Sequence, residues 1–227
     1  MSDGLLYLLM LIPVIVLHEL SHGYVAHLLG DDTAKNAGRL TLNPLKHVDP
    51  FGSILVPLLL AVGQIVTIGH VDFLYGWARP VPVNALNLQY HGVHNPRRLM
   101  AVVAIAGPAM NFALALLAGL ALHAGIGLEY LIFFIEINLI IGIFNLIPLP
   151  PMDGGRIAVG ILPLPLAKIL AGAERLGIVL VLLVLFVLPT ALQQAGVQFN
   201  PFQDAMAKIL PSAEGIVLKL TGNDFGN

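Results

Sequence analysis

The feature that most constrains this chain is its set of long apolar segments. A helix that crosses a bilayer needs about 20 mostly apolar residues. Four segments are near that length: Leu5–Leu29, Leu99–Leu128, Tyr130–Pro148 and Leu176–Leu192. Charged residues make up 11% of the chain, whereas soluble domains carry about 25%. The sequence therefore predicts an all-α, polytopic membrane protein with about four transmembrane helices.

The same composition excludes several other classes of protein. The 11 Lys and Arg residues are outnumbered by 13 Asp and Glu residues and form no basic run, so nucleic acid is not an expected partner. The hydrophobic content of 57% excludes a disordered chain. Because the chain has no cysteine, it can form neither disulfides nor thiolate metal sites.

The apolar segment Phe51–Gly69 carries no charge, and its course decides the topology. Loops that face the cytoplasm carry an excess of Lys and Arg. If this segment enters the membrane and returns, the basic loop residues share one face: Lys35, Arg39, Lys46, Arg79, Arg97, Arg98, Arg156, Lys168 and Arg175. We therefore expect a re-entrant or interfacial segment, an N-terminus outside the cytoplasm, and a multi-pass protein of the cytoplasmic (inner) cell membrane. A full crossing by these 19 residues stays open.

Two short segments in the basic loops favour extended structure. Apolar and polar residues alternate in Gly38–Asn43, as in a strand. In Ala78–Val83, Pro80 and Pro82 lie two residues apart, so their missing N–H groups fall on one edge, which suits an edge strand. We expect a small β-hairpin or sheet on the cytoplasmic side; the alternative for residues 78–83 is a plain proline-rich loop.

The first apolar segment contains the pattern His18-Glu19-Leu20-Ser21-His22. Residues four apart lie on one face of a helix, about one turn from each other. Two imidazoles in that arrangement can bind one metal ion, and the glutamate between them can act on a metal-bound water. Ionisable groups inside a spanning helix are costly and indicate function. The alternative is a set of polar residues at an interfacial helix end.

A catalytic zinc site usually has three protein ligands, and Asp153 is the best candidate for the third. It follows an apolar segment that ends in three prolines and precedes two glycines, which permit a tight turn. His27 faces the opposite side of the first helix. Asp31 and Asp32 are expected to be solvated loop residues. The alternative for Asp153 is a role in a helix-capping turn.

These motifs together resemble those of the site-2 protease family of intramembrane zinc metalloproteases. The resemblance rests on the HExxH pattern in a membrane helix and on the downstream segment Asn145-Leu-Ile-Pro-Leu-Pro-Pro-Met-Asp-Gly-Gly. Three further segments support it: Gly38–Pro44, Gly76–Val83 and Gly107–Asn111. The resemblance covers about Leu11–Arg156.

The resemblance implies a role for each residue of the site. His18, His22 and Asp153 would bind one zinc ion, and Glu19 would be the catalytic base. Asn145 matches a family residue that holds substrate near the metal, whereas Asn111 is expected to shape the core.

The implied activity is hydrolysis of peptide bonds in transmembrane protein substrates, within the lipid bilayer, by a zinc-activated water. We expect one membrane-embedded metalloprotease domain over 1–227, with a core at 5–156 and a C-terminal helix and amphipathic tail at 157–227. A PDZ or CBS domain is not expected. The alternatives are a membrane metal transporter and an inactive membrane chaperone of the same fold. The substrate, gating, homo-oligomer formation and the roles of Glu136, His91 and His94 stay open.

Overall fold

The computed structural model describes residues 3–71, 76–92, 94–173, 176–177, 179, 181, 183–194 and 199–223, and these residues are mostly helical. The helices are α1 (Asp3–Leu28), α2 (Thr33–Asn36), α3 (Val56–Ile68), α4 (Pro96–His123), α5 (Leu128–Asn145), α6 (Asp153–Ile161), α7 (Leu164–Gly172), α9 (Leu188–Gln194) and α10 (Pro201–Leu220). Short helical turns are η1 (Pro44–Lys46), η2 (Pro50–Leu55), η3 (Ala85–Asn87) and η4 (Leu183–Val187).

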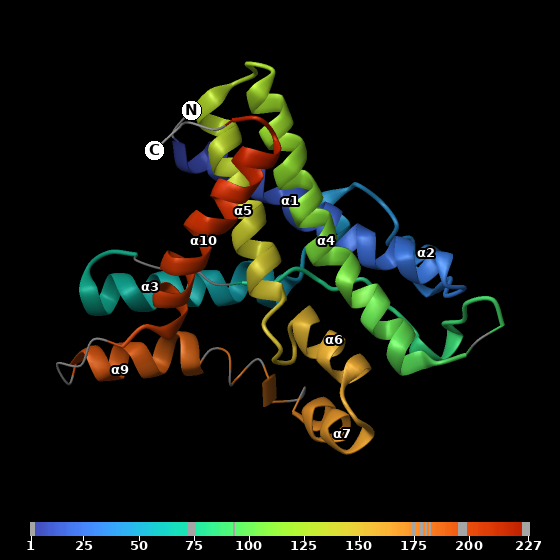
Figure 1. Ribbon diagram of the computed structural model, residues 1–227. Helices are drawn as coiled ribbons and strands as arrows, with labels where there is room; N and C mark the ends of the chain where they lie inside the picture. Colours follow the sequence, from blue (N-terminus) through green and yellow to red (C-terminus); the bar gives the residue numbers. More distant parts are fainter. Residues whose placement is uncertain are drawn as a thin grey trace.

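Helix α4 is the centre of the molecule, because α1, α5, α6 and α10 all pack against it (Figure 1). The main core cluster joins α4 and α5 to α10 through Ala115, Ala118, Leu122, Ile135, Leu139 and Val217. The predicted helical segments Leu5–Leu29, Leu99–Leu128 and Tyr130–Pro148 correspond to α1, α4 and α5.

Two helical segments, Leu9–Leu28 and Pro96–His123, are long and apolar enough to cross a membrane. The apolar part of α5, Tyr130–Asn145, is shorter. Within the predicted span Leu176–Leu192, residues 178, 180 and 182 lie outside the described part of the chain. A helical membrane protein is supported, and the count of four crossings stays a prediction.

Helix α3 runs across the direction of α5 and α10 instead of beside them (Figure 1). Its apolar side chains are widely exposed, among them Leu58, Leu59, Val62, Ile65 and Val66. An apolar helix in this orientation suits a re-entrant or interfacial position better than a crossing, and that assignment stays a prediction.

The expected β-hairpin is not seen, because the described residues of both segments form no strand. Pro80 and Pro82 have no N–H group to contribute to a β-ladder. The carbonyl group of Arg79 instead accepts a hydrogen bond from the guanidinium group of Arg39, at 2.7 Å. A side chain thus takes the place that a backbone partner would have in a sheet.

The C-terminal tail forms α10, and its end is fastened to α4. Thr221 packs on Gly119, where a Cβ atom would lie 2.6 Å from the hydroxyl oxygen of Thr221. The side-chain amide of Asn223 donates to the carbonyl oxygen of Gly119 at 2.7 Å. The carboxyl group of Glu214 on α10 also lies near enough to Glu136 on α5 for their charges to interact. Glu136, which the sequence left unexplained, thus faces a second carboxyl group.

Candidate metal centre

Helix α1 presents His18 and His22 on the face that packs against α4. Both side chains are buried, with exposed fractions of 6% and 8%. Their Nε2 atoms lie 3.2 Å apart. The helical spacing of four residues, predicted from the sequence, therefore brings the two ring nitrogens to one point.

Asp153 is the first residue of α6 and brings its carboxylate to the same point. Its Oδ2 atom lies 3.2 Å from the Nε2 atom of His18 and 3.2 Å from that of His22. Gly154 and Gly155 make this position accessible, because a Cβ atom on either would collide with backbone atoms of residues 146–150. The two glycines thus let α6 begin directly against the end of α5.

A chain of hydrogen bonds fixes which nitrogen of His18 carries a proton. The side-chain amide of Asn138 donates to the carbonyl oxygen of Phe134 at 2.7 Å, a group that can only accept. Asn138 Oδ1 therefore accepts from the amide of Asn111 at 3.1 Å. This leaves Asn111 Oδ1 facing Nδ1 of His18, which must donate. The Nε2 atom of His18 is consequently left with a lone pair.

The second imidazole is oriented in the same way. Its Nδ1 atom lies 2.8 Å from the carbonyl oxygen of Val103 on α4, so this nitrogen donates and Nε2 again keeps a lone pair. Metal-binding histidines commonly donate their other N–H to a carbonyl or carboxylate, which sets the tautomer and the ring direction. Both histidines therefore have the tautomer that suits metal binding.

The three converging atoms fit a zinc ion. Two nitrogen lone pairs and one carboxylate oxygen face each other, and the buried Oδ2 atom of Asp153 has no hydrogen-bond partner. Such a group needs a cation at its centre. Tetrahedral zinc with ligand bonds of about 2.0–2.1 Å separates its ligand atoms by about 3.3 Å, close to the 3.2 Å observed. This is the one group of three such ligands among the described residues.

Helix α4 faces the site with Gly107, a residue that has no side chain. A Cβ atom at this position would collide with the imidazole rings of His18 and His22. The segment Gly107–Asn111 thus supplies both the space for the rings and the hydrogen bond to His18. Asn111 shapes the core, as expected, and the sequence missed its contact with the site.

Glu19 lies outside the group of three ligand atoms. It is half-buried, and its Oε2 atom accepts a hydrogen bond from the main-chain N–H of Val81 at 3.0 Å. The loop that was predicted to be a strand therefore crosses over the glutamate of the HExxH pattern.

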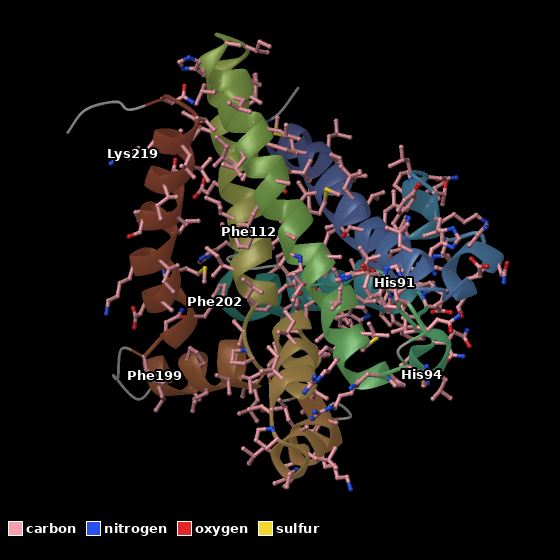
Figure 2. The ribbon with its side chains drawn as sticks, turned by 45° about the vertical axis from the view of Figure 1, so that its right-hand side comes forward. His91, His94, Phe112, Phe199, Phe202 and Lys219 are labelled. Carbon is pink, nitrogen blue, oxygen red and sulfur yellow. The ribbon has the colours of Figure 1, made fainter. Side chains whose placement is uncertain are left out.

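Other predicted residues lie apart from the three ligands. The side-chain amide of Asn145 donates to the carbonyl oxygen of Ile141 in its own helix, at 3.0 Å. His91 and His94 lie on the loop that precedes α4 (Figure 2). The ring of His91 stacks edge-on against Tyr90, and Nδ1 of His94 contacts the carbonyl oxygen of Leu88.

Sequence reasoning missed two polar residues. Asn138 is fully buried in α5, and a lone amide in an apolar helix was the signal that could have found it. Asp31 was expected to be solvated, which is wrong: it is fully buried. It accepts hydrogen bonds from Thr33, Asn84 and Asn87, and so ties the end of α1 to the loop before η3.

Comparisons with known proteins find a peptidase family and relatives that are named as zinc metalloproteases. The model of peptidase family M50 matches residues 119–189. The Bacillus subtilis protein named "Putative zinc metalloprotease YwhC" is 39% identical over an alignment of 230 positions, which covers 92% of this chain and 96% of that protein. Rip2 of Mycolicibacterium smegmatis, which has the same designation, is 35% identical over 61% of this chain and 50% of its own length. Rip2 of Mycobacterium tuberculosis is 31% identical over 77% of this chain and 63% of its own length. No solved structure matches the chain.

Proposed function

Because the chain belongs to peptidase family M50, the site-2 protease family, we propose that His18, His22 and Asp153 bind its zinc ion. Glu19 is the catalytic base in this proposal. The observation that carries it is the triangle of two imidazole lone pairs and one carboxylate oxygen, 3.2 Å on each side.

The protein is an intramembrane zinc metalloprotease, as its family and its relatives indicate. It acts on transmembrane protein substrates in the lipid bilayer. A metal transporter and an inactive chaperone of the same fold are not favoured, because the polar groups converge on one site and the glutamate of the HExxH pattern is present.

When bound, zinc supplies a Lewis acid that polarises the scissile carbonyl group and activates water for attack. Glu19 takes the proton from the attacking water and passes it to the leaving amine. Asn111 and the carbonyl group of Val103 hold the two imidazoles in the tautomer that leaves Nε2 free. His18 and His22 therefore remain neutral ligands while Glu19 moves the proton.

The substrate must be extended at the cleaved bond, because a helical peptide bond is shielded by its own hydrogen bonds. The extended loop at residues 76–84 crosses beside Glu19 and offers backbone groups at this point. Asn145, at the end of α5, is proposed to hold the substrate near the metal.

The membrane arrangement is also part of the proposal. The chain forms one membrane-embedded domain over 1–227, with several crossings of the cytoplasmic membrane and with the basic loops inside. Helix α3 lies in or along the membrane on that side, since its apolar side chains are exposed. A homo-oligomer is compatible with this arrangement.

The test compares wild-type enzyme with Glu19→Gln on a purified transmembrane substrate, with a chelator control. Glu19→Gln is expected to keep its zinc and lose cleavage, because glutamine cannot accept the proton. Cleavage that survives the Glu19→Gln substitution, or cleavage by wild type that survives removal of zinc by the chelator, would overturn the proposed function.

A further inference from the structure

The loop that crosses the HExxH glutamate has one main-chain donor at the point of contact. In Pro80-Val81-Pro82, the prolines have no N–H group. The single N–H of the three residues, that of Val81, donates to Oε2 of Glu19 at 3.0 Å. The contact is between the backbone and the proposed base, so the Val81 side chain does not provide it.

The flanking prolines also hold the backbone of this loop in one conformation. Each proline fixes its own φ angle, and each restricts the residue before it to extended conformations. Arg79 and Val81 are therefore both extended before any contact forms. Little conformational freedom is lost when the Val81 N–H points at Glu19.

The loop is fastened on both sides of Val81. On one side, the N–H of Arg79 donates to the carbonyl oxygen of His47 at 2.8 Å. On the other side, the N–H of Asn84 donates to Oδ2 of the buried Asp31 at 2.6 Å. These contacts connect the loop to η1 and to the end of α1.

The Val81 side chain packs the loop against α1 at Gly23, the residue after His22. It is buried, with 7% of its surface exposed, and a Cβ atom at Gly23 would lie 2.8 Å from its Cγ1 atom. The glycine allows the loop to approach the helix that carries Glu19. The position of the N–H is thus set by packing as well as by hydrogen bonds.

We propose that the main-chain N–H of Val81 is a positioning group that holds the carboxylate of Glu19 for proton transfer. It binds one oxygen, Oε2, and leaves the other to take the proton from water. The inference rests on the proposed function of Glu19 as the base. Without this N–H, the glutamate rotates about its side-chain bonds and spends less time in the reactive orientation.

The direct test replaces the amide at Val81 by an ester, by incorporating the α-hydroxy analogue of valine during cell-free translation. This change removes the N–H and keeps the side chain. The kcat is expected to fall about 10- to 100-fold, the range found for outer-shell partners of metal sites. The KM and the zinc content are expected to stay within about twofold of wild type, because the Val81 N–H is used by Glu19 and is therefore neither offered to the substrate nor in contact with the metal.

Two substitutions serve as matched variants. Val81→Ala keeps the N–H but loosens the packing of the loop on α1, so its kcat is expected to fall less than that of the ester enzyme. Val81→Pro removes the N–H at similar volume and is expected to lose kcat as the ester does. If Val81→Pro fails to fold, the ester enzyme still decides the question.

Wild-type kcat in the ester enzyme would overturn the inference, and so would equal losses in the ester enzyme and Val81→Ala. Glu19→Gln is measured beside them. If Glu19→Gln is inactive and the ester enzyme is fully active, only the inference fails. If Glu19→Gln is active, the proposed function is wrong, and the inference about Val81 is wrong with it.

Discussion

Asn111 on α4 accepts the Nδ1–H hydrogen bond of His18 on α1, so a neutral amide decides which nitrogen of a metal ligand is free. The interaction joins residues 93 positions apart in the sequence. It connects the packing of two helices directly to the chemistry of the metal centre.

Replacing that amide should weaken zinc binding. Asn111→Ala removes the acceptor that holds the His18 tautomer, and outer-shell changes of this kind cost about 10- to 100-fold in metal affinity. Chelator competition on the detergent-solubilised enzyme measures the affinity. Asn145→Ala is the matched control, because its amide bonds to Ile141 in its own helix. Equal affinities in wild type and Asn111→Ala would contradict the assignment.

Removing the carboxylate ligand should empty the site. Asp153→Ala leaves two ligands where zinc needs three and a water, so zinc content measured by elemental analysis is expected to fall well below one ion per chain. Asp32→Ala, at an exposed aspartate, controls for general effects of losing a charge. A full zinc complement in Asp153→Ala would remove this residue from the ligand set.

A single methyl group on α4 should disturb both histidines. In Gly107→Ala the added Cβ atom collides with the rings of His18 and His22, so the rings must move. We expect loss of zinc and of cleavage, with helix content by circular dichroism unchanged. Gly215→Ala adds the same atom in α10, where nothing lies within 4 Å, and should behave as wild type. Normal zinc content in Gly107→Ala would contradict this prediction, because it would show that both imidazole rings can accommodate the added methyl group without leaving the metal.

The buried Asp31 should make the stability depend on pH. Burial alone would raise the pKa of Asp31, but hydrogen bonds from Thr33, Asn87 and Asn84 hold it below the usual value. The carboxylate therefore stabilises the fold fully above the unfolded pKa of about 3.9. This stabilisation is lost as the pH falls through the lower, folded pKa.

Asp31→Asn tests this dependence. It weakens hydrogen bonds to a charged group, each worth about 1.5–3 kcal/mol, so unfolding at neutral pH should occur at a lower temperature. When the pH is lowered, the melting temperature of Asp31→Asn should fall less than the melting temperature of wild type. Asp32→Asn is the control. Parallel acid profiles in wild type and Asp31→Asn would be evidence against a role for this carboxylate.

Local patterns in the sequence predicted the parts of the site that depend on local structure. The spacing of His18 and His22 follows from helix geometry, and the prolines and glycines around Asp153 indicate its turn. The Asn111–Asn138 contact depends on how α4 and α5 pack, which helical periodicity does not reveal. The hairpin prediction failed because alternation does not show that a side chain, Arg39, takes the hydrogen bond of a strand partner.

The place of Val217 in the core has a consequence for biosynthesis. It packs with Ala115, Ala118, Ile135 and Leu139 of the two preceding core helices, yet α10 leaves the ribosome after every other helix described here. During translation, α4 and α5 are therefore made before the helix that covers part of their apolar surface. A chain truncated before α10 would leave these apolar side chains uncovered.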